Sequence, residues 1–171
     1  MSTLIQAQFI TTLIEPLTLG SGNVGFQTNC NVPGVVSVES KPYSPISLSD
    51  VSITSVDIDV SVTKFIAQGN EYFYTTWNLV TDDSTTKHPL RFLFKMRVPE
   101  QMIGIGHRPV YYAGYDNGQP GDKVEHWGHE QDTSTKVIRA EVNNAIYEME
   151  CVPTSHHTSL AVEVTFKKHQ K

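Results

Sequence analysis

The chain has 171 residues, of which 39% are hydrophobic and 18% are charged, a composition typical of a folded domain that excludes a disordered chain. We expect one domain spanning residues 1–171, since this length holds a single hydrophobic core. The net charge of −5, with no basic cluster, argues against a nucleic-acid partner, and two cysteines (Cys30 and Cys151), whose pairing the sequence leaves open, are too few for a disulfide scaffold.

The first segment, residues 2–15, carries apolar residues at helical spacing. Ile5, Phe9 and Leu13 would form one stripe of an amphipathic helix that ends at Pro16. The threonines and isoleucines of the segment suit a strand equally well, so helix and strand both remain open. The segment lacks the basic start and uninterrupted apolar run of a signal peptide, so we expect a chain that is either cytoplasmic or secreted after processing.

Apolar and polar residues alternate with a period of two in the middle of the chain. Residues 56–62 and 90–98 place aliphatic or aromatic residues on one face and charged or hydroxyl residues on the other. Residues 71–80, EYFYTTWNLV, are rich in aromatic and β-branched residues. These patterns predict half-buried antiparallel strands. Turn signals separate the predicted strands at residues 20–25, 42–45, 82–89, 115–122 and 153–157.

A tyrosine-rich segment follows the strand at 90–98. Residues 98–118 contain two prolines and four glycines, so we expect this segment to be largely loop. Tyr111, Tyr112, Tyr115 and the nearby Trp127 would then form an aromatic cluster. Rings with an apolar body and a polar tip suit the headgroup layer of a bilayer or the face of a sugar, and they also bind quaternary ammonium groups. The alternative is that these rings cap the end of the core.

Two motifs near this segment match a phosphate-binding loop and a zinc site only in part. GIGHRP at 104–109 lacks the third glycine and the following helix of a phosphate-binding loop. His126 and His129 are weak metal-ligand candidates, but Gly128 between them does not suit the helix of a zinc motif, and a solvated loop is the simpler interpretation. No nucleophile motif is present. We therefore expect no metal, no cofactor and no enzymatic activity.

The last third of the chain predicts one helix and two strands. Residues 134–143 have apolar residues at roughly helical spacing and are expected to form a short helix. Residues 146–152 and 159–168 are expected to be strands, the second with clear alternation. The predicted fold is mainly all-β, an antiparallel β-sandwich with one or two short helices, with a closed barrel as the second choice.

Three stretches of the chain resemble the actinoporin-like family of pore-forming cytolysins. FYTTWNLVTDDSTTKHPLRFLFKMRVPE at 73–100 is similar to that family's strand, acidic turn, strand and closing VP sequence. VYYAGYD at 110–116 stands where the family has an aromatic loop, and MECVPTSHHTSLAVEVTFKK at 149–168 is similar to its closing hairpin. The same fold occurs in fungal fruit-body lectins, so the resemblance alone does not fix a function.

The resemblance implies a β-sandwich flanked by helices whose aromatic loop binds phosphocholine headgroups. It also implies that the N-terminal segment, residues 1–16, detaches and inserts during oligomeric pore assembly. This segment is shorter than the roughly 20 residues that cross the hydrocarbon core. Glu100 and Gln101 stand where the family has an aromatic residue and aspartate. The positions that match the family's lipid site are Pro99, Tyr111, Tyr112, Tyr115 and Tyr147.

Three hypotheses on function follow. The first is a non-enzymatic protein that binds membrane lipid headgroups through residues 98–115, as a cytolysin does. The second is a lectin of similar fold, in which Tyr111, Tyr112 and Trp127 stack on sugar rings. The third is a homo-oligomeric shell or fibre subunit with the apolar segment 102–112 as its interface. An enzyme ranks behind all three.

Overall fold

Strands account for nearly all of the chain that the structure, a computed structural model, describes. The described residues are 5–14, 17–27, 39–47, 54–62, 72–80, 90–97, 110–116, 135–142, 144–154 and 159–170. They form β1 (Ile5–Leu13), β2 (Thr18–Gln27), β3 (Glu39–Tyr43), β4 (Ile46–Ser47), β5 (Thr54–Val62), β6 (Tyr72–Leu79), β7 (Arg91–Arg97), β8 (Val110–Asp116), β9 (Lys136–Val142), β10 (Ala145–Pro153) and β11 (Ser159–Gln170).

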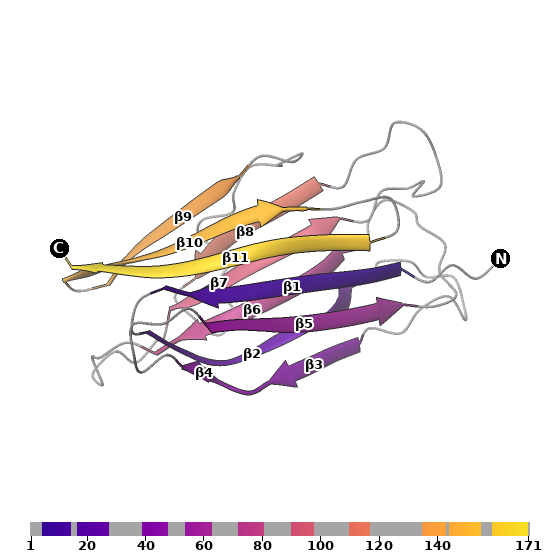
Figure 1. Cartoon of the computed structure of the whole chain (residues 1–171), viewed down its shortest axis with the longest axis horizontal. Helices are drawn as coiled ribbons and strands as arrows, with labels where there is room; N and C mark the ends of the chain where they lie inside the picture. Colours follow the sequence, from indigo (N-terminus) through magenta and orange to yellow (C-terminus); the bar gives the residue numbers. More distant parts are fainter. Residues whose placement is uncertain are drawn as a thin grey trace.

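The strands form two sheets that pack face to face (Figure 1). The front sheet of Figure 1 has the order β5-β1-β11-β10-β9, and the back sheet has the order β3-β2-β6-β7-β8, with β4 also paired to β2. Neighbouring strands are antiparallel except β1 and β11, which are parallel. The predicted β-sandwich is confirmed.

The core lies between the sheets and is rich in aromatic side chains. Residues of β6 alternate between half-buried and buried positions, as the sequence pattern predicts. Trp77 of β6 contacts Phe166 of β11 with ring centroids 5.3 Å apart, and Phe92 of β7 contacts the same ring at 5.6 Å. Phe166 therefore joins the front sheet to two strands of the back sheet.

The prediction of a short helix at 134–143 is wrong, because residues 136–142 form the edge strand β9. Ile138 and Ala140 face the core, while Val137 and Arg139 are exposed, which is the period of a strand. Pairing with β10 supplies the hydrogen bonds that a helix would otherwise make internally. No residue that the structure describes is helical.

Residues 5–13 of the N-terminal segment form the strand β1, so the helix alternative is wrong for these described residues. β1 lies between β5 and β11 and pairs with both. Ala7, Phe9 and Leu13 have no exposed surface. Detachment of residues 1–16 remains a prediction, and it would require β1 to leave its place between β5 and β11 and expose these side chains to water.

Two segments rich in turn residues are strands instead. Residues 110–116, expected as part of a loop, form β8, and residues 20–25, expected as a turn, lie within β2. The pairing of β2 with β6 shifts register between Leu19 and Gly22. A side chain at Gly20 would place its Cβ 3.3 Å from the backbone oxygen of Asn78, so glycine allows the two strands to approach closely there.

The described cysteine, Cys151 of β10, is a fully buried free thiol. Burial raises the pKa of this thiol well above its ordinary value, and the neighbouring Glu150 adds to the effect. Since the thiolate is the reactive form, Cys151 is expected to be inert to a thiol reagent at neutral pH until the protein unfolds. A Cys30→Ser variant leaves Cys151 as the single thiol. Rapid labelling of this variant in the folded state would contradict the prediction.

Candidate ligand-binding face

The tyrosines that the sequence grouped together lie on different sides of the back sheet. Tyr111 is 1% exposed and stacks on Phe94, with ring centroids 5.9 Å apart. Tyr115 is partly buried against the core and meets Phe92 edge to face. Tyr112 points to the outer face. The interpretation that the rings belong to the core therefore holds for Tyr111 and Tyr115, and a shared binding surface for all three is wrong.

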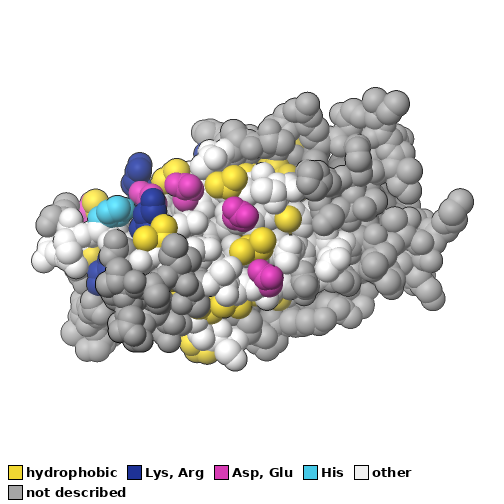
Figure 2. Space-filling view, in the orientation of Figure 1, with side chains coloured by type: hydrophobic (Ala, Val, Ile, Leu, Met, Phe, Trp, Pro, Cys, Tyr) yellow, Lys and Arg dark blue, Asp and Glu magenta, His cyan; other side chains and the backbone are white. Residues whose placement is uncertain are grey.

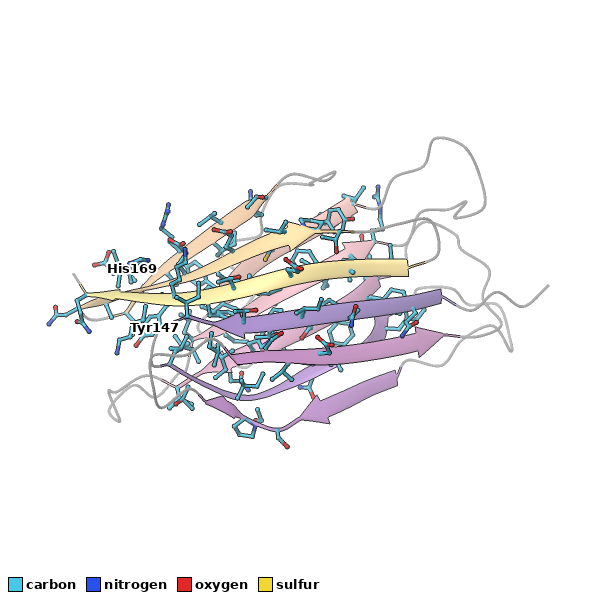
Figure 3. All side chains as sticks on the ribbon, viewed as in Figure 1. Tyr147 and His169 are labelled. Atoms are coloured by element: carbon cyan, nitrogen blue, oxygen red, sulfur yellow. The ribbon has the colours of Figure 1, made fainter. Side chains whose placement is uncertain are left out.

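Tyr147, the fourth described tyrosine of the predicted lipid site, lies in β10 and is 3% exposed. Its ring faces the core side of the front sheet, and the Nζ atom of Lys168 lies 5.7 Å from the ring centroid. Figure 3 labels Tyr147 and His169, which both lie toward the C-terminal end of β11. Because its side chain is buried, Tyr147 is part of the hydrophobic core.

The remaining predicted site residues, Pro99, Trp127, His126 and His129, lie outside the described residues. Within the described ranges, no three histidine, cysteine, aspartate or glutamate side chains come together as a metal site would require. Metal binding by His126 and His129 therefore stays a prediction from the sequence.

Tyr112 belongs to a group of aromatic and basic side chains on the outer face of the back sheet. Its ring meets that of Tyr72 edge to face, with centroids 5.8 Å apart. The Nζ atom of Lys95 lies 5.5 Å from the centroid of the Tyr72 ring, within the range of a cation–π interaction. We call this group the tyrosine–lysine face, and it comprises Tyr72, Tyr74, Lys95, Arg97 and Tyr112.

Strand register brings these side chains together from three strands. Lys95 of β7 has Tyr74 of β6 as its partner on one side and Tyr112 of β8 on the other. Arg97 pairs with Tyr72. Residues in register on one face of an antiparallel sheet have neighbouring side chains. Lys95 thus occupies the middle of the face, with tyrosines on both sides.

Two glycines lie at register positions on the outer face of the back sheet. Gly25 of β2 is the register partner of Tyr74, and Gly114 of β8 is the partner of Leu93, so neither glycine places a side chain on this surface. Leu93 itself is 4% exposed although it belongs to the outer face. The tyrosines and the lysine of this face are half-buried, so part of each side chain is exposed.

Three of the four charged residues at outer positions of β6, β7 and β8 are basic, namely Arg91, Lys95 and Arg97, and the fourth, Asp116, is the register partner of Arg91. Partial burial lowers the pKa of Lys95 from its ordinary value, because desolvation disfavours the charged ammonium. The outer face of the front sheet, shown in Figure 2, carries a mixture of acidic and basic side chains.

A second charged cluster surrounds Glu148 on the outer face of the front sheet. The side chain of Glu148 is 8% exposed, and Arg139 of β9 donates a hydrogen bond from Nε to Oε2 at 2.8 Å. The Nε2 atom of His169 lies 3.8 Å from the same oxygen, and Lys167 is the register partner of Glu148 on β11. A buried carboxylate needs such partners, so this cluster is explained as a structural link among β9, β10 and β11.

Four members of the tyrosine–lysine face were not predicted from the sequence, namely Tyr72, Tyr74, Lys95 and Arg97. The signal that could have found them is the parity of the two strands. Once Phe73 and Trp77 are assigned to the core, Tyr72 and Tyr74 must point outward, and the same rule turns Lys95 outward beside Phe94. What the sequence does not contain is the register that places them together.

Comparison with known proteins finds no family that matches this chain and no curated protein that matches its sequence. The actinoporin-like resemblance therefore stays a prediction that rests on the quoted motifs. Among the described residues there is no helix with the length and apolar character needed to cross a membrane.

Proposed function

We propose that the protein is a non-enzymatic, carbohydrate-binding β-sandwich that binds sugar rings on the tyrosine–lysine face. The observation that carries the proposal is the packing of Tyr72 and Tyr112 around Lys95 on the outer face of the back sheet. Tyrosine rings offer an apolar surface for the C–H face of a sugar and a hydroxyl for hydrogen bonding. Lysine adds donors for sugar oxygens.

The rigidity of the sheet supports this proposal. All members of the face come from paired strands, and contacts within the face restrict the Tyr72, Lys95 and Tyr112 side chains before any ligand binds. A surface that is already ordered loses less conformational entropy on binding. Such preorganisation suits the weak individual contacts that sugars make.

Carbohydrate is preferred over phosphocholine for a geometric reason. A quaternary ammonium group binds over the face of an aromatic ring, and Lys95 already lies over the ring of Tyr72. Of the tyrosines in the predicted lipid site, Tyr111 and Tyr147 are buried and Tyr115 packs against the core. Membrane binding stays a prediction, to be checked by co-sedimentation with phosphatidylcholine–sphingomyelin vesicles.

The test is binding to an array of neutral and acidic oligosaccharides by the wild type and two Tyr112 variants. Tyr112→Ala is expected to weaken binding to the recognised glycans about tenfold, equivalent to roughly 1.4 kcal/mol, because the stacking surface is lost. Tyr112→Phe keeps the ring and is expected to retain most of the affinity.

Gln8→Ala is the matched control, since Gln8 lies on the outer face of the opposite sheet. It is expected to bind like the wild type. A wild-type protein that binds no glycan, or a Tyr112→Ala variant that binds as well as the wild type while folded, would refute the proposal.

A further inference from the structure

We infer that the tyrosine–lysine face selects acidic sugars, binding a carboxylate or sulfate group at Lys95 and Arg97 while the sugar ring rests on Tyr112. This inference rests on the proposed carbohydrate-binding function and adds the class of ligand. The ligand would be an acidic polysaccharide, such as one containing uronic acid or sulfated residues.

The charge of this face is the first argument. The chain as a whole carries a net charge of −5, yet three of the four charged residues at outer positions of β6, β7 and β8 are basic, and the acidic one, Asp116, is the register partner of Arg91 and not of Lys95 or Arg97. On the front sheet, by contrast, Asp57 and Glu163 are exposed on the outer face. A cationic surface on an acidic protein attracts an anion to one face in particular.

The spacing of the cations is the second argument. Lys95 and Arg97 are two residues apart in β7, so their side chains project from the same face about 7 Å apart along the strand. Tyr112 is next to Lys95 in register, and Val110 is next to Arg97. A polymer lying along β7 could therefore bring successive acidic groups to the two cations while its rings cover β8.

The environment of Lys95 is the third argument. Its ammonium group is partly buried and lies over the Tyr72 ring, and this burial lowers its pKa. A bound carboxylate or sulfate favours the charged form of the lysine and forms a charge-assisted hydrogen bond with it. A neutral sugar hydroxyl would form a weaker bond, so the site is expected to distinguish charged sugars from neutral ones.

Matched polymers test the inference with the full-length protein. Binding of the wild type is measured to polygalacturonate and to its methyl ester, which share a backbone and differ in charge, and to chondroitin sulfate and desulfated chondroitin. Poly-L-glutamate serves as a polyanion without sugar. We expect at least tenfold tighter binding to each more acidic polysaccharide than to its matched partner, and weaker binding as the salt concentration rises.

Three variants locate the selectivity. Lys95→Gln is expected to lose most of the preference for polygalacturonate over its methyl ester, and Lys95→Arg is expected to keep it. Lys167→Gln makes the same change of net charge on the outer face of the front sheet, and is expected to leave the preference intact. Thermal unfolding of each variant checks that the comparison is made on folded protein.

The outcomes separate the two proposals. Equal affinity for the more acidic and the less acidic member of both pairs would overturn the acidic-sugar inference and leave carbohydrate binding standing. If poly-L-glutamate binds as tightly as polygalacturonate, binding depends on charge alone. That result would overturn both the carbohydrate-binding proposal and the acidic-sugar inference. A Lys95→Gln variant that stays folded and keeps the full preference would place the selectivity elsewhere and overturn the inference.

Discussion

A Tyr111→Ala variant is expected to lose about 3–5 kcal/mol of the free energy of unfolding, the range measured when large aromatic residues are removed from protein cores. Tyr111 is 1% exposed and stacked on Phe94, so alanine would leave a cavity between the sheets. Tyr112→Ala, one position further on, is expected to cost about 1 kcal/mol, since its ring is only half-buried. Urea denaturation of both variants measures the difference.

Tyr111→Phe is the control for this pair, because it keeps the ring in the core. It is expected to cost much less than Tyr111→Ala. Equal stability losses for the alanine variants at positions 111 and 112 would contradict the assignment of these two tyrosines to opposite faces. A variant with alanine at both Tyr111 and Tyr112 would therefore weaken binding through loss of stability, whatever surface the protein uses.

Deletion of residues 1–13 is expected to abolish folding. The deletion removes β1, which separates β5 from β11, and takes Ala7, Phe9 and Leu13 out of the core. It also leaves two strand edges of the front sheet without their partner. Loss of the near-ultraviolet circular dichroism signal and of cooperative urea unfolding would report the result.

Two point variants within β1 make the deletion interpretable. Phe9→Ala is expected to cost about 3–5 kcal/mol, whereas Gln8→Ala on the outer face is expected to cost less than about 1 kcal/mol. A truncated chain that retains a cooperative transition at wild-type denaturant concentration would show that β1 is dispensable. That result would favour the detachable N-terminal segment that the actinoporin-like resemblance implies.

The elements that could be predicted from the sequence are those whose alternation is long and uninterrupted. Residues 56–62, 90–98 and 159–168 keep apolar residues on one face throughout, and they overlap the strands β5, β7 and β11. Residues 134–143 have a short mixed pattern in which Val137, Ala140 and Glu141 also fit a helix. In this segment the pairing with β10 favours strand over helix, and such a long-range contact cannot be predicted from the local pattern.

The candidate site was harder to predict than the fold. Treating 98–118 as a loop allowed Tyr111 and Tyr112 to share one surface, but neighbours in a strand point to opposite sides. The true neighbours of Tyr112 on its face are Tyr72 and Lys95, which come from other strands. The glycines and prolines around β8 favoured a loop over a strand. Tyr72, Lys95 and Tyr112 come together only through the register of the back sheet.

The parallel pairing of β1 with β11 has a consequence for how the protein is made. Gln6 pairs with Ser159 and Leu13 with Phe166, so the first and last described strands are neighbours inside one sheet. During synthesis, β1 leaves the ribosome long before β11 is made. In that interval the apolar residues of β1 are exposed to water. Contacts this distant along the chain also slow folding. We therefore expect the nascent chain to depend on chaperones until β11 has emerged.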